Sequence, residues 1–529
     1  MTENTADKNI SSKNNTDRKR WFIFVGIIMV ITLLCGILVC RQKHIEFCDE
    51  SYTYESANSV WKDNIYDRWN SWMSGEEISL YYAATDINPH FITIMKKLWT
   101  DHVPLYFWLI RIASLIAYRS SSPWIGMGLN LFLTVLFQMW FFYVIGKKSD
   151  FSRKMLPVPV AFSLLFFSQP LFYSELNLIR MYLLLSYELI MLIWYMACFC
   201  TEDHKKKEIA YVLTVACGLI THYLFLPFYG ITAILVFVFM IINAREKIMH
   251  FIRINIVAVV LSCIMDPYWL WRLFRYNLFV RTYSGAVKKI EFGKAVLHAA
   301  RTLIREPFGG VIPFIPAFIL TALVFITALF LVRDKKNKAL LALITVADFC
   351  YLVIVYLMNG GAGRYHYPAL SIWIVMEYMA VIYIAACFLR KKDKKVFWHF
   401  LPLTVIVLFL GLNILNLTTK EIDSLNPVSA EDELRERFSD IPWVVYCEEH
   451  TWLEECAAYK YMIPSQICFV SPHYLPEEEF ELPGEIILVT AEEKSEEALD
   501  HLKLLSGTEA EIKGDAVISG PMGFYPVGF

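Results

Sequence analysis

The stretch RKRWFIFVGIIMVITLLCGILVC, residues 18–40, joins a basic cluster to an apolar run long enough to cross a bilayer. The run is too long for the apolar part of a cleaved signal peptide, and no small-residue cleavage site follows it. We therefore expect an uncleaved signal anchor whose basic cluster holds the N-terminus inside the cell. The next stretch, RQKHIEFCDESYTY at 41–54, then opens an outer loop that carries Asp49 and Glu50 beside the membrane edge.

The rest of the chain is also rich in apolar runs. Of its 529 residues 57% are hydrophobic and only 19% are charged, whereas soluble proteins carry about a quarter of charged residues. This composition predicts a polytopic α-helical membrane protein. The net charge of -2 gives no indication of a nucleic-acid partner. Further apolar runs lie at 124–145, 155–172, 181–200, 209–222, 224–242, 254–270, 311–332, 339–358, 367–389 and 397–415.

Five clusters of Lys and Arg separate these runs, and neighbouring clusters always lie two runs apart. The positive-inside rule places all five in the cytoplasm and predicts about eleven full spans, thirteen at most, with the C-terminus outside. Residues 105–118 are apolar too, but a full span there would reverse the side of every later cluster. Either this segment is short, tilted or re-entrant, or the cluster at 146–154 breaks the rule.

The composition becomes acidic and globular in the last part of the chain. Strand patterns at 443–446, 466–470 and 485–490 alternate with helix patterns at 451–461 and 495–505, which predicts a small α/β domain. The expected organisation is an inner tail at 1–20, a membrane domain at 21–420 with its first outer loop at 41–103, and an extracytoplasmic α/β domain at 421–529.

Several polar residues of the outer segments are candidates for chemistry. A carboxylate such as Asp49 at a water–lipid boundary can accept a proton from a hydroxyl, although two adjacent acids in a loop are often only solvated. Arg180 begins an apolar run, where an arginine usually has a partner or a function, or else extends its side chain to the interface. The stretch GGAGRYHYP at 360–368 offers backbone N–H groups and the guanidinium of Arg364, both suited to a phosphate.

Other function classes lose support from motifs that the sequence lacks. It has no phosphate-binding P-loop, no GxGxxG that opens a helix after a strand, no CxxC pair and no HExxH. A nucleotide-driven pump and a zinc protease are therefore disfavoured.

In this order the elements resemble the GT-C fold membrane glycosyltransferases, most closely protein O-mannosyltransferases and the lipid A aminoarabinose transferases of bacteria. The resemblance covers residues 21–415 and rests on four motifs. Two departures stand out: Val103 replaces a proline, and Asn177, Leu178 and Ile179 lengthen the spacing before Arg180. The motifs are the acidic pair at 49–50, HVPLY at 102–106, YSELNLIRMY at 173–182 and RYHYP at 364–368.

The resemblance implies transfer of a sugar from a polyprenyl-phosphate carrier to an acceptor hydroxyl on the outer face of the cytoplasmic membrane, with inversion at the anomeric carbon. The transfer would modify a cell-envelope glycan, lipid or protein. Asp49 would be the general base, supported by Glu50, and Arg180 and Arg364 would bind the donor phosphate. Some members use a divalent metal and others need none, so no cofactor is certain and metal use stays open. Candidate residues for the substrate pocket are His102, Tyr106, Tyr182, His222, Tyr365 and His366.

Two other functions remain open at this point. A transporter or lipid flippase would place functional charges within its spans, and Glu188, Asp266 and Asp348 suit that alternative. A non-catalytic assembly partner would bind through the C-terminal domain, and the substitution Asp49→Asn would then leave its function unchanged.

Overall fold

The structure is a computed structural model of the whole chain. It describes residues 3–43, 48–59, 68–85, 91, 94, 102–148, 151, 155–201, 207–271, 291–308, 312–359, 363–389, 397–419, 434, 436–438, 440–447, 466–473, 480–519 and 522–529.

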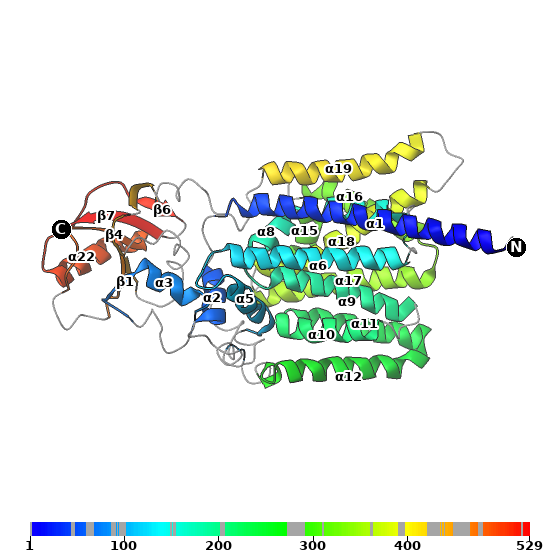
Figure 1. Ribbon diagram of the computed structural model, residues 1–529, viewed down its shortest axis with the longest axis horizontal. Coiled ribbons are helices and arrows are strands. Elements are labelled where there is room, and N and C mark those ends of the chain that lie inside the picture. Colours follow the sequence, from blue (N-terminus) through cyan, green and yellow to red (C-terminus); the bar gives the residue numbers. More distant parts are fainter. Residues whose placement is uncertain are drawn as a thin grey trace.

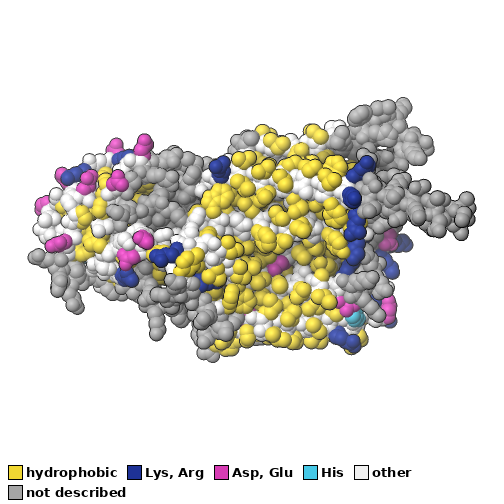
Figure 2. All heavy atoms as spheres, in the orientation of Figure 1, with side chains coloured by type: hydrophobic (Ala, Val, Ile, Leu, Met, Phe, Trp, Pro, Cys, Tyr) yellow, Lys and Arg dark blue, Asp and Glu magenta, His cyan; other side chains and the backbone are white. Residues whose placement is uncertain are grey.

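A bundle of long apolar helices forms the membrane body, and a sheet lies beyond one of its ends (Figure 1). In the space-filling view an apolar belt covers the body, and Lys and Arg side chains gather at the end opposite the sheet (Figure 2). The helices of the body are α1 (Glu3–Cys40), α5 (Leu105–Ile116), α6 (Trp124–Lys148), α7 (Pro157–Phe166), α8 (Pro170–Asn177), α9 (Tyr182–Thr201), α10 (Glu208–Thr221), α11 (Phe225–Asn243), α12 (Ile248–Met265), α15 (Phe292–Arg305), α16 (Phe314–Leu331), α17 (Lys335–Asn359), α18 (Tyr367–Leu389) and α19 (Phe397–Thr419).

Eight helices in the described residues are long and apolar enough to cross a membrane, so the chain is a multi-pass membrane protein as predicted. Shorter apolar helices include α5, α7 and α10, and the predicted count of about eleven spans stays a prediction. Helix α5 has 12 residues and is therefore about 18 Å long, well short of the hydrocarbon core. Of the two alternatives for residues 105–118, the short segment is the one that the structure shows. Pro104 precedes its first turn, where a missing N–H has no consequence.

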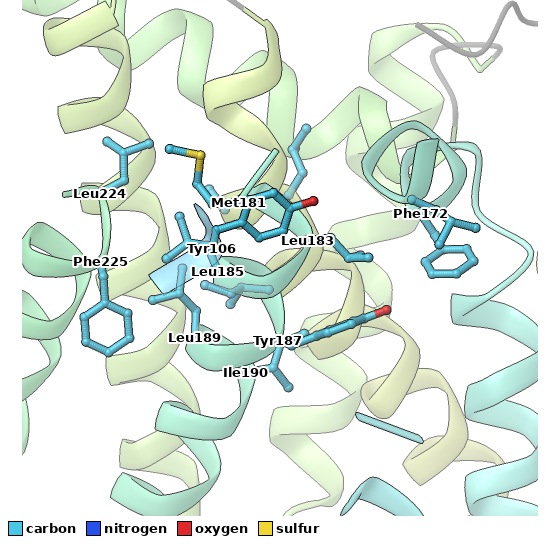
Figure 3. Close-up of a cluster of buried hydrophobic side chains, with 14 of the residues drawn as sticks. Tyr106, Phe172, Met181, Leu183, Leu185, Tyr187, Leu189, Ile190, Leu224 and Phe225 are labelled. Carbon is cyan, nitrogen blue, oxygen red and sulfur yellow. The ribbon is translucent and has the colours of Figure 1, made fainter. Parts of the chain in front are cut away.

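Helix α9 occupies the centre of the body. In its apolar window 72% of the residues are buried, compared with 22% in α1, α12 and α16, which line the outside. Its side chains Leu183, Leu185, Tyr187 and Leu189 pack in the cluster shown in Figure 3. Nearly all residues at the start of α9 are therefore buried among neighbours, and this close packing anchors the segment before it, which carries Arg180.

Two short helices and a strand from the first outer loop connect the body to the sheet. Helix α2 (Cys48–Asn58) packs on α3 (Gly75–Tyr82), where Tyr81 Oη donates to Glu55 Oε1 at 2.9 Å. Ser74 caps α3 together with Glu77, each side chain accepting from the other residue's backbone N–H. Strand β1 (Trp72–Ser74) ends directly before α3, so a strand of the sheet continues into the helix that supports α2.

The sheet has the strand order β1-β3-β2-β4-β7-β5, with β6 paired to β7. Strands β2 (Trp443–Tyr446), β3 (Gln466–Val470) and β4 (Glu485–Ala491) are parallel, and helix α22 (Ser495–Ser506) follows them. These elements lie where the sequence predicted them, whereas the helix predicted at 451–461 falls outside the described residues. The sequence missed β5 (Glu511–Ile512), β6 (Val517–Ser519) and β7 (Met522–Gly528).

The sequence also missed that the first outer loop completes this sheet. Strand β1 pairs antiparallel with β3, with Trp72 opposite Cys468 and Ser74 opposite Gln466. The side chain of Trp72 stacks on Phe480, and its indole N–H donates to the Glu481 carbonyl at 3.3 Å. The sequence-based prediction of a loop at 41–103 and a separate domain at 421–529 did not include this contact between the two segments.

Candidate active site

Asp49 lies in the first turn of α2, where the positive end of the helix dipole favours a carboxylate. Its Oδ2 is 2.6 Å from Arg364 Nη2, and the side chains are 23% and 27% exposed respectively. Arg364 comes from the short helix Gly363–His366 (η5), which directly precedes α18. Residues more than three hundred positions apart in the sequence thus form an ion pair that a ligand can still reach.

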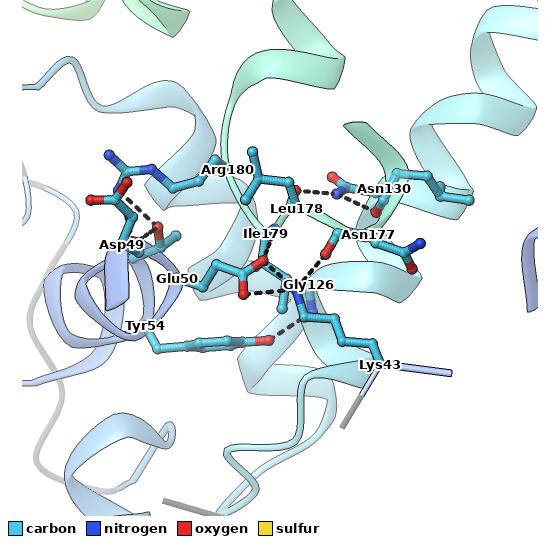
Figure 4. A network of polar contacts seen from close by, with 12 residues as sticks. Lys43, Asp49, Glu50, Tyr54, Gly126, Asn130, Asn177, Leu178, Ile179 and Arg180 are labelled. Carbon is cyan, nitrogen blue, oxygen red and sulfur yellow. Dashed lines mark hydrogen bonds and ion pairs between the residues drawn. The ribbon is translucent and has the colours of Figure 1, made fainter. Parts of the chain in front are cut away.

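Arg180 approaches the same turn of α2 from the segment between α8 and α9 (Figure 4). Its Nη1 donates to the Asp49 carbonyl at 3.0 Å and to Thr53 Oγ1 at 3.1 Å, and its Nη2 lies 3.4 Å from His102 Nε2. The guanidinium also lies 5.9 Å from the centre of the Tyr52 ring. Arg180 is 3% exposed, and its Nε has no hydrogen-bond partner in the described part of the chain. A buried cation with an unused donor beside an accessible carboxylate suits an anionic ligand.

Glu50 lies on the other side of α2 and is completely buried. Its Oε1 and Oε2 lie 2.5 Å and 2.7 Å from Lys43 Nζ, and Oε1 also accepts from the Ile179 N–H at 2.5 Å. Lys43 Nζ donates in turn to the Asn177 carbonyl at 2.6 Å. A carboxylate with both oxygens engaged and no exposure does not reach a substrate, so the geometry favours a positioning role for Glu50 over a catalytic one.

The insertion that the sequence showed before Arg180 is the segment that these groups hold. Asn177 and Ile179 are bound through their backbone by Lys43 and Glu50, and Asn130 Nδ2 donates to the carbonyls of Leu176 and Leu178 at 3.0 Å. The three extra residues therefore form a tightly held link that begins with the last residue of α8, Asn177, and leads toward α9. Lys43 and Asn130 were not predicted from the sequence. Asn130 could have been, because a polar residue inside the apolar run 124–145 often has a specific role.

Three of the predicted pocket residues form an aromatic group next to the arginines. The ring of Tyr182 lies 5.7 Å from that of Tyr365 and 5.5 Å from that of His222, while the rings of His222 and Tyr365 are 6.5 Å apart. Burial, and secondarily the charge of Arg180, lowers the pKa of His222 to about 3. His222 is therefore neutral, and its Nδ1 accepts from the Leu224 N–H at 3.0 Å. The hydroxyl of Tyr182 is buried with no hydrogen-bond partner among the described residues.

Two other predicted pocket residues do not join Asp49. Tyr106 is fully buried and donates to Asn130 Oδ1 at 3.0 Å, so it braces the support of the 177–179 link. His366 is 5% exposed and lies against Tyr356 of α17, with ring centres 4.0 Å apart. His102, by contrast, lies beside Arg180 and Tyr52, and its place in a substrate pocket stays a prediction.

The acids that suited the transporter alternative are buried in the helical body. Glu188 accepts from Thr221 Oγ1 at 2.9 Å, and Asp266 accepts from the Tyr268 N–H at 3.1 Å. Asp348 is fully buried, and neither of its oxygens has a hydrogen-bond partner among the described residues. None of the three belongs to the group around Asp49. The described residues contain no cluster of three His, Cys, Asp or Glu side chains that would hold a metal ion.

The architecture is the GT-C fold of polytopic membrane glycosyltransferases, which confirms the fold that the motif order predicted. Two solved structures of ArnT from Cupriavidus metallidurans are similar to the chain, each with a TM-score of 0.53 and 10% sequence identity. The structure bound to undecaprenyl phosphate matches over 95% of this chain and 98% of its own, and the apo structure over 95% and 97%. No family model matches the chain, and no curated protein matches it in sequence. At this identity the similarity is one of fold.

Proposed function

We propose that the protein is a membrane glycosyltransferase that moves a sugar from a polyprenyl-phosphate carrier to an acceptor hydroxyl outside the cytoplasmic membrane. The observation that carries the proposal is the convergence of Asp49, Arg180 and Arg364 from three separate segments at one end of the helical body. A transporter has no evident need for such a group, whereas a transferase needs both a base and cations for a phosphate leaving group.

The contacts suggest how the parts act in turn. The donor phosphate binds Arg364 and the unused Nε of Arg180, and so draws Arg364 away from Asp49. The freed carboxylate accepts the proton of the acceptor hydroxyl while the acceptor oxygen attacks the anomeric carbon from the opposite face. The bond between that carbon and the phosphate oxygen breaks, and the carrier phosphate leaves with a charge that the two guanidinium groups stabilise.

Support for this class of donor comes from the fold neighbour, since one of the two ArnT structures is bound to undecaprenyl phosphate. Lys and Arg side chains at the opposite end of the body favour an outer position for Asp49 and the sheet, with the N-terminus inside (Figure 2). The acceptor class is a glycan, lipid or protein of the cell envelope.

The test is transfer from labelled undecaprenyl-phosphate sugars in proteoliposomes that contain the wild-type protein or Asp49→Asn. We expect turnover that this substitution abolishes and that Glu76→Gln, an exposed acid in the first turn of α3, leaves intact. Unchanged turnover in Asp49→Asn would refute its role as the base. Transbilayer movement of the lipid without sugar transfer would favour a flippase.

A further inference from the structure

Two adjoining cavities lie between helices α6, α9 and α18, the first in the middle of the body and the second at the ends of α6 and α18 away from Asp49. Their volumes are about 340 Å³ and 610 Å³, within the range of ligand pockets. Ile145, Trp194, Met379 and Tyr383 line both cavities, which therefore form one groove. Apart from Lys148 and the hydroxyl of Tyr383, the lining is apolar.

The groove has a cationic mouth where α6 and α9 end. Lys148 lines the second cavity, and its Nζ lies 5.3 Å from the centre of the Trp194 ring. Lys207, directly before α10, places its Nζ 5.8 Å from the same ring and 3.0 Å from Cys198 Sγ. Both ammonium groups therefore place positive charge beside one indole at this end of the groove, where they can attract an anion.

We propose that this groove binds an anionic phospholipid of the inner leaflet, with its acyl chains in the cavities and its phosphate between Lys148 and Lys207. The apolar lining matches acyl chains, and lysines near the membrane surface attract anionic headgroups. A carrier whose phosphate lies beside Asp49 cannot also place that phosphate between the two lysines, because the 20 residues of α9 separate the two ends of the body by about 30 Å. The lipid would therefore be a resident ligand and not a substrate.

The experiment uses the purified full-length protein in detergent. Native mass spectrometry counts bound phosphatidylglycerol, phosphatidylcholine and undecaprenyl phosphate at equal concentrations. We expect retention of phosphatidylglycerol over phosphatidylcholine, and the double variant Lys148→Gln/Lys207→Gln should weaken phosphatidylglycerol binding about fivefold per lysine. The control Arg245→Gln/Lys247→Gln removes two charges in the short helix before α12, outside the groove, and should leave binding intact.

Ala386→Phe provides a second, independent variant, because it fills the second cavity and keeps both lysines. It should lower the binding of both phospholipids. Equal binding of the two phospholipids by the wild type, or full binding by either groove variant, would overturn the proposal. Displacement of phosphatidylglycerol by undecaprenyl phosphate in a manner that depends on the two lysines would assign the groove to the carrier instead.

Discussion

The two faces of helix α2 carry adjacent carboxylates in opposite environments. Asp49 pairs with Arg364 where both side chains are about a quarter exposed, whereas the Glu50–Lys43 pair is sealed, with exposures of 0% and 1%. A ligand can reach Asp49 and Arg364 and replace their contact with contacts to itself. The Glu50–Lys43 pair is closed to solvent and therefore to a ligand. The comparison shows that burial and partners, and not sequence position, separate an acid that can react from one that holds the chain in place.

The largest effect is expected at the accessible face. Asp49→Asn keeps the shape and removes the proton acceptor, so transfer should fall about 10²–10⁴-fold, the usual contribution of a general base. The unfolding temperature should stay close to that of the wild type, because Arg180 contacts the Asp49 carbonyl and not its side chain. Rates in proteoliposomes and a thermal unfolding scan check both parts. A large loss of stability would mean that the Asp49–Arg364 pair is structural.

Substitutions in the buried Glu50–Lys43 pair should instead lower the stability of the fold. Lys43→Met leaves Glu50 as a buried charge without its partner, and such losses cost about 3–5 kcal/mol. The double variant Lys43→Met/Glu50→Leu removes both charges and should recover part of that loss. Unfolding midpoints of both single variants and the double variant give the coupling between the two residues. Equal, additive losses would argue against a coupled pair.

Arg364→Lys should have a smaller, donor-specific effect. Lysine keeps the charge but loses the planar fork that binds a phosphate through two hydrogen bonds. We expect the KM for the carrier-linked sugar to rise about tenfold, which corresponds to about 1.4 kcal/mol. Arg305→Lys, in the last turn of α15, is the matched control. A change in kcat alone would contradict a role in donor binding.

The remaining prediction concerns the pH dependence of stability. His222 has a pKa of about 3 in the fold and about 6.5 when unfolded, so the unfolded chain binds the proton more readily. Its contribution is fully present above pH 6.5 and is lost as the pH falls toward 3, at about 1.4 kcal/mol per pH unit. The difference in unfolding midpoint between pH 7 and pH 5 should therefore shrink in His222→Asn. An identical pH dependence in both proteins would contradict a buried, neutral His222.

Hydropathy and basic clusters predicted the membrane body because the period and length of apolar runs are local properties of the chain. Asp49, Arg180 and Arg364 could be singled out as candidates because charged residues beside hydrocarbon are rare. Lys43 was not singled out, because its structural role depends on contacts with Glu50 and Asn177 that form only in the folded chain. Strand β1 was missed for a similar reason: its three residues carry too little alternation, and its partner β3 is remote in sequence.

The pairing of β1 with β3 also determines when the first outer loop can be completed during protein synthesis. Trp72 is bonded to a carbonyl 409 positions further along the chain, so the ribosome makes almost the entire protein before this contact can form. Until then the strand that leads into α3, and through it the support of α2, lacks its neighbour. A chain that ends before β3 would carry Asp49, Arg180 and Arg364 and still lack this contact, so the first loop can be completed only after β3 has been made.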